Sequence, residues 1–246
     1  MKKLYALLLV FAAGATHAAD LTVSAASSLT ESFRDIATAY EKANPGTKVD
    51  LNFAASGVLL QQIARGAPVD VFASADQTTM DQAAGQGLLE AGSRQVFAEN
   101  TLWVVVPPQA KQRPTSLAAL AAPGIESVAI GNPDSVPVGR YARSALQQAG
   151  IWPAIQAKII STQNVRQSLD YVARGEVDAG FVYATDAQAM PDRVQRAFQV
   201  PVAGGITYPL AQIKGSSNAA QAQRFIAFVR SAQGKAILQR YGFGSP

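Results

Sequence analysis

Residues 21–31 read Leu-Thr-Val-Ser-Ala-Ala-Ser-Ser-Leu-Thr-Glu, a short apolar run that passes directly into a Ser/Thr-rich turn. The run is typical of a buried strand. The turn is typical of a helix start, because Ser28 stands three residues before Glu31 as in a capping box. The same order, a β-branched apolar run followed by a segment of helical period, recurs along the chain. This alternation predicts an α/β protein built from parallel βαβ units.

The predicted elements cover most of the chain. Strands are expected at Leu21–Ala25, Lys48–Ala54, Val69–Ser74, Thr101–Val106, Ser127–Gly131, Ala157–Ser161, Ala179–Tyr183, Ala197–Pro201 and Thr207–Ile213. Helices are expected at Leu29–Ala43, Val58–Arg65, Gln77–Gly85, Ser116–Ala121, Gly139–Ala149, Val165–Arg174 and Ala219–Tyr241. We expect the last helix to break near Ser231–Gly234, and loops at Pro107–Pro114, Ala121–Glu126 and Met190–Arg193.

Two strands, Thr101–Val106 and Thr207–Ile213, fall where the chain would cross between lobes. A chain that leaves one lobe and later returns to it predicts two α/β lobes, each a mostly parallel sheet flanked by helices. We assign residues 19–102 and 207–246 to one lobe and residues 103–206 to the other. Ligands of open α/β sheets bind beyond the carboxyl ends of the strands, where helices begin. The strand-to-helix junctions facing the interlobe cleft are therefore where we expect the site.

Residues 1–18 have the pattern of a secretory signal peptide. Met1–Lys3 is basic, Leu4–Ala13 is apolar, and small residues lead to a cleavage site expected after Ala18. The apolar run is too short to span a bilayer, which takes roughly 20 residues. The pattern predicts an exported, soluble protein located in the periplasm.

Cleavage would also remove chemistry from the chain. His17 is the only histidine and there is no cysteine, so the mature protein would lack imidazole, thiolate and disulfide groups. This excludes metal sites built from His or Cys and nucleophilic triads that need a histidine. Loss of Lys2 and Lys3 takes Lys+Arg from 21 to 19 against 17 acidic residues, so the net charge falls from +4 to +2. With no basic cluster and no phosphate-loop, dinucleotide or hydrolase motif, we expect no nucleic-acid partner, no enzyme activity and no cofactor.

Three junctions carry hydroxyl groups. Ser28 and Ser56 are candidate N-caps after the first two strands, and Gly57 lets the backbone approach a neighbour closely. Tyr183 ends the strand Ala179–Tyr183. Taken singly, each serine fits an ordinary cap and the tyrosine fits a half-buried packing residue.

Two further junctions offer backbone donors. The turn Asn132–Gly139 is stiffened by two prolines and would leave the N–H of Val138 free. Asn164 is a candidate N-cap, which would make the N–H of Val165 one of the unpaired donors of its first turn. Helix N-termini carry about half a positive charge each, so several of them converging on a cleft predict an anion site made of uncharged groups.

A site with donors only favours a fully deprotonated anion, since a protonated phosphate needs a hydrogen-bond acceptor. Asp134 and Asp186 lie near these junctions, so phosphate is disfavoured without being excluded. Arg140 and Arg166 lie just after predicted helix starts. Each could lie on a solvent-exposed helix face or bind the carboxylate of a ligand. An organic acid or an amino acid therefore stays open as cargo.

Seven stretches, in the same order over essentially the whole mature chain, resemble the periplasmic molybdate-binding proteins of ABC importers. They are Ala26–Thr30, Phe53–Gly57, Gly66–Asp76, Gly131–Tyr141, Asn164–Arg166, Gly180–Tyr183 and Arg240–Phe243. The Gly66–Asp76 stretch, Gly-Ala-Pro-Val-Asp-Val-Phe-Ala-Ser-Ala-Asp, is the most specific of them.

The resemblance implies a two-lobed, type II periplasmic-binding-protein fold that closes over molybdate or tungstate. It implies that the hydroxyls of Ser28, Ser56 and Tyr183 hold the oxyanion oxygens. It adds the backbone N–H groups of Ser28, Ser56, Val138 and Val165, with no protein ligand on the metal itself. It also implies an ABC importer permease as partner, and we expect a monomer.

Two departures from the family concern the turn before the fifth helix: Val138 stands where alanine is frequent, and Asn132 stands where aspartate is common. The Gly66–Asp76 stretch is interpreted as structural, because its two carboxylates would repel an anion that they faced. Alternatives are a binding protein for sulfate, thiosulfate or an amino acid. A Ser/Lys hydrolase using Lys158 is a further alternative, which no S-x-x-K spacing supports.

Overall fold

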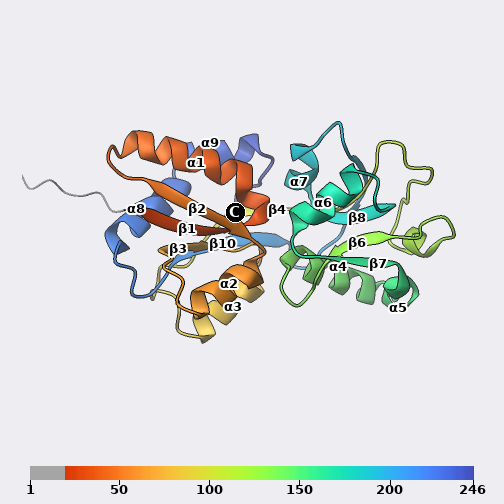
Figure 1. Ribbon diagram of the computed structural model, residues 1–246, viewed down its shortest axis with the longest axis horizontal. Helices are drawn as coiled ribbons and strands as arrows, with labels where there is room; N and C mark the ends of the chain where they lie inside the picture. The colour runs from red at the N-terminus through yellow and green to blue at the C-terminus, as the bar shows by residue number, and fades with distance from the viewer. Residues whose placement is uncertain (1–19) are drawn as a thin grey trace, which may run out of the picture.

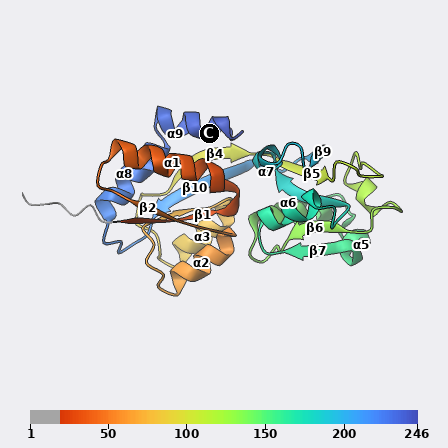
Figure 2. The ribbon, with the colours of Figure 1, turned by 45° about the horizontal axis from the view of Figure 1, so that its top comes forward.

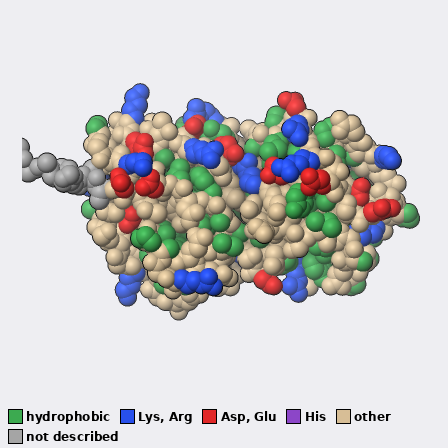
Figure 3. All heavy atoms as spheres, viewed as in Figure 1, with side chains coloured by type: hydrophobic (Ala, Val, Ile, Leu, Met, Phe, Trp, Pro, Cys, Tyr) green, Lys and Arg blue, Asp and Glu red, His purple; other side chains and the backbone are tan. Residues whose placement is uncertain are grey.

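The computed structural model describes residues 20–246, so the predicted signal peptide and its cleavage site lie outside the described residues. Two five-stranded sheets lie side by side, each covered by helices on both faces (Figures 1 and 2). We call the parts built on these sheets the first and the second lobe. In the described part, no helix is long and apolar enough to cross a membrane. Basic and acidic side chains are interspersed over the face seen in Figure 3.

The first lobe is built on a sheet in which four strands run in one direction and one runs against them. Its order is β2 (Val49–Ala54), β1 (Leu21–Ala26), β3 (Val71–Ala73), β10 (Ile206–Gln212) and β4 (Gln95–Asn100). The first three strands are parallel, and β10 is antiparallel to both β3 and β4.

The second lobe repeats this plan. Its order is β7 (Ile159–Thr162), β6 (Val128–Gly131), β8 (Ala179–Tyr183), β5 (Leu102–Val106) and β9 (Gln195–Val200). Here β5 is the reversed strand, antiparallel to β8 and β9. The two-lobed α/β architecture predicted from the sequence is confirmed.

Helices connect the parallel strands within each lobe. The first lobe contains the 3₁₀ turn η1 (Ser27–Leu29) and the helices α1 (Thr30–Ala43), α2 (Ser56–Ala64), α3 (Gln77–Gly85), α8 (Ala219–Val229) and α9 (Ala232–Arg240). The second contains η2 (Ala118–Ala121), α4 (Pro137–Gln148), α5 (Trp152–Ile155), η3 (Gln156–Lys158), α6 (Val165–Ala173) and α7 (Ala184–Ala189).

Helix α1 shows why these segments pack as they do. Phe33, Ile36, Ala37 and Tyr40 follow the i, i+3, i+4, i+7 spacing of one helix face, and all four are buried. The Tyr40 ring meets Phe225 of α8 edge-on, with 5.2 Å between the ring centroids. The apolar stripe therefore fixes α1 and α8 together on one face of the first sheet.

The chain crosses between the sheets twice. Only Thr101 separates β4 of the first sheet from β5 of the second, and residues 201–205 lead back from β9 to β10. Pro209 lies inside β10, where it has no N–H to donate, and the β10–β4 register shifts between Tyr208 and Pro209. Both crossovers enter the reversed strand of the sheet that they reach.

Several elements differ from the sequence expectation. Strand β4 was not expected, because Gln95–Asn100 is an edge strand of mixed polarity in which only Phe97 and Ala98 are buried. Helices α5 and α7 were missed because they are only four and six residues long. The expected helix at Ser116–Ala121 is the 3₁₀ turn η2. The predicted break in the last helix is confirmed, with Ser231 as the N-cap of α9.

Candidate functional site

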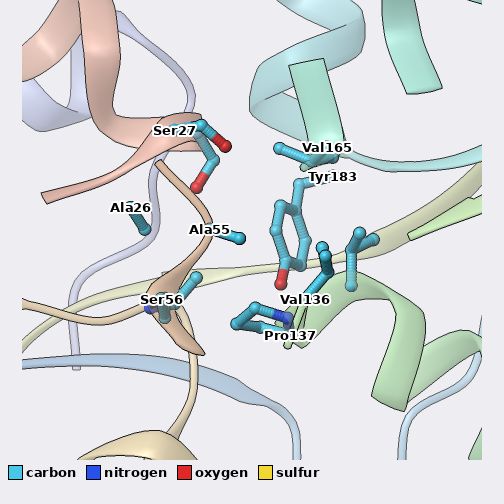
Figure 4. Close-up of a pocket in the computed structure, with 11 residues that line it drawn as sticks. Ala26, Ser27, Ala55, Ser56, Val136, Pro137, Val165 and Tyr183 are labelled. Carbon is cyan, nitrogen blue, oxygen red and sulfur yellow. Dashed lines mark hydrogen bonds between the residues drawn. The ribbon is translucent and has the colours of Figure 1, made fainter. Parts of the chain in front are cut away.

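A small cavity of about 10 Å³ lies between the two lobes, beyond the carboxyl ends of the strands. The first lobe lines it with Ala26, Ser27, Ser28, Ala55, Ser56 and Ala75, and the second with Val136, Pro137, Val138, Val165 and Tyr183. In Figure 4 the Tyr183 ring lies between Ala55 and Val136, and its hydroxyl points toward Pro137. No lining residue carries a formal charge.

All five residues predicted for the site line this one cavity: Ser28, Ser56, Val138, Val165 and Tyr183. The lining includes six residues that the sequence analysis did not assign to the site: Ala26, Ser27, Ala55, Ala75, Val136 and Pro137. The apolar ones carry no chemical signal in the sequence. Ser27 does, because it stands beside a predicted site residue in the same turn.

Four helical segments begin at the cavity. Ser56 and Val165 are the first residues of α2 and α6, Val138 is the second residue of α4, and Ser28 lies in the turn that leads into α1. Backbone N–H groups in a first helical turn have no partner within their own helix. The cavity therefore receives the positive ends of several helices from both lobes.

Two of the predicted N-caps are wrong. The N-cap of α1 is Leu29 and the N-cap of α2 is Ala55, and neither Ser28 nor Ser56 caps with its side chain. The predicted cap Asn164 is confirmed, since its side chain accepts the backbone N–H three residues further on at 3.0 Å. The two serine hydroxyls have other partners, and these bear on the chemistry of the cavity.

The Ser56 hydroxyl is held as an acceptor by a backbone group. Its Oγ accepts the backbone N–H of Ala75 at 3.0 Å, which leaves its own hydrogen free to donate. The phenol of Tyr183 is buried and finds no hydrogen-bond partner in the part of the chain that is described. Burial raises the pKa of Tyr183 well above its ordinary value, so the phenol keeps its proton and can donate it.

Arg140 and Arg166 do not line the cavity. Arg140 of α4 reaches the first lobe, where its guanidinium contacts Asp76 at 2.7 Å and donates to Thr79 Oγ1, also at 2.7 Å. Asp76 is also the N-cap of α3, accepting the N–H of Thr79 at 3.1 Å. The carboxylate clamp that the sequence left open is therefore not formed by Arg140, whose charge is matched inside the protein.

Arg166 of α6 is matched in the same way. It pairs with Glu31 of α1 in the first lobe, and its Nε lies 2.9 Å from Oδ1 of Asp186 in its own lobe. Asp186 is fully buried and accepts the N–H of Tyr183 at 3.1 Å. Both arginines thus connect the lobes through carboxylates, on elements that also line the cavity.

The remaining sequence candidates lie elsewhere. The carboxylate of Asp70 accepts the N–H of Thr22 at 2.8 Å and the hydroxyl of Ser216 at 2.6 Å, so this part of the Gly66–Asp76 stretch is structural, as interpreted. Lys158 donates to three backbone carbonyl groups next to η2, away from the cavity serines. In the described part, no group of three or more His, Cys, Asp or Glu residues is arranged to hold a metal ion.

The lobes meet at backbone distance beside the cavity. The N–H of Gly57 in α2 donates to the carbonyl of Ser135 in the second lobe at 3.0 Å. A Cβ at position 57 would lie 2.6 Å from that oxygen, closer than real Cβ contacts. Glycine is required here because the two backbones touch.

A family model for bacterial extracellular solute-binding proteins matches residues 21–244. The chain belongs to that family. The molybdate-binding protein ModA of Escherichia coli (strain K12) is 36% identical over 245 residues, covering 96% of this chain and 94% of the relative. ModA of Mycobacterium tuberculosis (strain ATCC 25618 / H37Rv) is 37% identical, covering 95% and 88%.

Solved structures agree with this placement. The periplasmic molybdate-binding protein of Azotobacter vinelandii matches with a TM-score of 0.80 at 26% identity, over 92% of this chain and 99% of that one. The sulfate-binding protein SubI of Mycobacterium tuberculosis matches with a TM-score of 0.78 at 18% identity, over 91% and 86%, which shows a common fold. The two-lobed solute-binding fold and the predicted family are confirmed.

Gly57→Ala should weaken ligand binding by tenfold or more while the ligand-free protein stays stable. The added methyl group would push the two backbones apart beside the cavity, but it touches nothing that holds either lobe together. Titration calorimetry with molybdate, the anion in the names of these relatives, measures the affinity, and thermal unfolding measures the stability. Gly85→Ala is the matched control, since a Cβ there meets nothing within 4 Å. Unchanged affinity in Gly57→Ala would contradict the close interlobe contact.

The buried carboxyl of Asp186 should make stability fall as the pH rises. Burial raises the pKa of Asp186 to about 6 from 3.8, against the opposing effects of Arg166 and the Tyr183 N–H. Between about pH 4 and 6 the folded state therefore holds a proton that the unfolded chain has released, and it loses stability as that proton leaves. The loss is up to about 3 kcal/mol, from 1.36 kcal/mol per pKa unit.

Asp186→Asn should therefore gain stability relative to the wild type between pH 4 and pH 6.5, measured by thermal unfolding in a series of buffers. The exposed substitution Asp192→Asn should follow the wild-type profile. A difference between Asp186→Asn and wild type that stays constant over this range would show that Asp186 does not titrate there.

Proposed function

We propose that this solute-binding protein captures molybdate or tungstate in the interlobe cavity and delivers it to the membrane permease of an ABC importer. One observation carries the proposal: the cavity is lined by hydroxyls and helix starts from both lobes and by no charged side chain. Such a lining offers donors and positive helix ends, which suit an anion that brings no proton of its own.

The proposed contacts use the five predicted residues. The hydroxyls of Ser28, Ser56 and Tyr183 and the backbone N–H groups of Ser28, Ser56, Val138 and Val165 donate to the oxyanion oxygens. Two of these residues come from the first lobe and three from the second, so the anion joins the lobes when it binds. The metal atom of the anion receives no protein ligand, and no cofactor takes part.

The size of the cavity supports a small cargo. Its volume, about 10 Å³, is far below the roughly 300–1,000 Å³ typical of sites for larger organic ligands. Arg140 and Arg166, which a carboxylate cargo would need, are paired with Asp76, Glu31 and Asp186 instead. Both observations favour an inorganic oxyanion over an amino acid.

Sulfate is the second candidate, because it has the same charge and shape as molybdate. The donors come from helix starts, from the Ser28 and Ser56 hydroxyls, which have partners within the protein, and from the buried Tyr183 phenol, so their spacing is set before the anion arrives. A smaller anion would leave some of these buried donors unpaired, which costs affinity. We propose that this difference in bond length selects molybdate and tungstate over sulfate.

The proposed setting follows from the sequence pattern of residues 1–18: export by a cleavable signal peptide, and action in the periplasm as a soluble monomer with no catalytic role and no nucleic-acid partner. We propose lobes of residues 19–102 with 207–246 and of residues 103–206. The hinge would lie at the two crossovers, at Thr101 and residues 201–205. Short crossovers of this kind allow the lobes to move as units.

Thermal unfolding in a panel of oxyanions tests the function. Molybdate and tungstate should raise the midpoint in proportion to the logarithm of their concentration, since a ligand that binds only the folded state stabilises it by mass action. Sulfate, phosphate and amino acids should have much smaller effects at equal concentration. A larger effect of sulfate or of any amino acid would overturn the assignment of the cargo.

Tyr183→Phe should reduce molybdate affinity by about tenfold to a hundredfold, the value of one hydrogen bond to a charged group. The ring and its packing remain, so the unfolding midpoint of the ligand-free protein should not fall, because the buried phenol has no partner in the described structure. Tyr171→Phe on the same lobe is the control, since its phenol pairs with Gln167 outside the cavity. Equal molybdate affinities of Tyr183→Phe and wild type would show that the phenol does not bind the anion.

A further inference from the structure

A chain of hydrogen-bonded polar groups connects the Ser28 hydroxyl to the crossover between the lobes. Ser28 Oγ lies 3.0 Å from the phenol oxygen of Tyr208 on β10. Asn100, the last residue of β4, places its Nδ2 3.3 Å from that phenol oxygen and 3.0 Å from Thr185 Oγ1. The backbone N–H of Thr101 in turn donates to Asn100 Oδ1 at 2.9 Å. Neither Tyr208 nor Asn100 lines the cavity.

The direction of this chain is fixed by its backbone end. The N–H of Thr101 can only donate, so the amide atom facing it is the Asn100 oxygen, and the amide nitrogen must face Tyr208. Tyr208 therefore accepts a hydrogen bond from Asn100. Burial, with the charge of Asp186, raises the pKa of Tyr208 well above its ordinary value, so the phenol keeps its own proton.

That phenol proton has one acceptor. Tyr208 is fully buried, and in the described residues its oxygen has hydrogen-bond contacts with Asn100 Nδ2 and Ser28 Oγ alone. If Ser28 donated to Tyr208, the phenol hydrogen would be buried without a partner, which is costly. Tyr208 therefore donates to Ser28, and the hydrogen of Ser28 is left to point into the cavity.

We propose that Tyr208 and Asn100 are positioning residues that hold the Ser28 hydroxyl as a donor toward the anion and so exclude oxyanions that carry a proton. The inference rests on the proposed function of the cavity as an oxyanion site. A protonated oxyanion such as hydrogen phosphate must donate its own hydrogen, and Ser28 meets it with another hydrogen. An oxyanion without a proton accepts at every oxygen and meets no such conflict.

Ser28 is the serine whose hydrogen-bond direction can be changed by substituting its partner. Ser56 is fixed in the same sense, but its partner is the backbone N–H of Ala75, which every side-chain variant retains. For Ser28 the partner is a phenol, which Tyr208→Phe removes while keeping the ring and its edge-on contacts with Tyr183, Phe97 and Phe243. Without the phenol hydrogen, Ser28 is free to turn and accept from a protonated oxyanion.

The test compares selenate with hydrogen arsenate at pH 8, two tetrahedral dianions of similar size that differ by one proton. Calorimetry, or displacement of bound molybdate, gives the affinity of each for the wild-type protein and for Tyr208→Phe. We expect the wild type to prefer selenate, and the ratio of the two affinities to fall by about tenfold in the variant, the value of one hydrogen bond. Tyr40→Phe, a buried tyrosine of the same lobe that bonds Gln221 instead, should keep the wild-type ratio.

Asn100→Asp gives a second, independent variant. It replaces the amide donor facing Tyr208 by an acceptor, so the phenol would donate to the new carboxylate and Ser28 would donate to the phenol. The added negative charge weakens both dianions alike, so the ratio reports the direction of the hydrogen bonds alone. This ratio should fall at least as far as in Tyr208→Phe.

Equal losses of selenate and hydrogen arsenate affinity in both variants would reduce Tyr208 and Asn100 to a packing role and overturn the proposal. So would a wild type that binds hydrogen arsenate as well as selenate, although its capture of molybdate would still stand. A wild type that binds molybdate, tungstate and selenate no better than it binds chloride would instead overturn the proposed function itself.

Discussion

Parallel strands that end at one edge of a sheet begin their helices at that edge, and the rest of this structure depends on that constraint. In both lobes three parallel strands end toward the cavity. The helical segments that follow β1, β2, β6 and β7 start there with unpaired N–H groups. The reversed strands β5 and β10 carry the chain across between the lobes, so these edges face each other. The positive helix ends are thus concentrated in one cavity without any charged side chain.

The charged residues near the cavity are neutralised among themselves. Arg140 of the second lobe pairs with Asp76 of the first lobe. Arg166 of the second lobe pairs with Glu31 of the first lobe and with the buried Asp186 of its own lobe. These pairs help to hold the lobes in contact while leaving the cavity lined by neutral groups. An incoming anion therefore meets the helix ends and hydroxyls, and no buried carboxylate opposes it directly.

The hydroxyl groups add direction to this neutral lining. Ser56 accepts from a backbone N–H, Ser28 is paired with Tyr208, and Tyr183 is buried with no partner in the described structure. A hydroxyl that already accepts from a fixed donor has its hydrogen available for the ligand. A cavity of about 10 Å³ has room for about one water molecule, so water can do little to compensate for a wrong polarity. The identity of each partner therefore decides which kind of anion the site accepts.

The sequence by itself determined the α/β class, the two lobes, the family and the five residues that meet at the cavity. It could do so because strands, helix starts and crossovers leave local patterns, as at Leu21–Glu31. It missed β4, α5 and α7, whose short or polar segments carry little periodicity. The sequence also suggested Ser28 and Ser56 as N-caps, because a serine near a helix start gives the same pattern whichever group its hydroxyl bonds to.

Only the tertiary structure decided the partners of these side chains. Tyr208 lies 180 residues from Ser28, Ala75 lies 19 residues from Ser56, and Arg166 and Glu31 are 135 residues apart. Hydrogen bonds and ion pairs between distant segments depend on how the strands, helices and lobes pack together, and no local pattern records that.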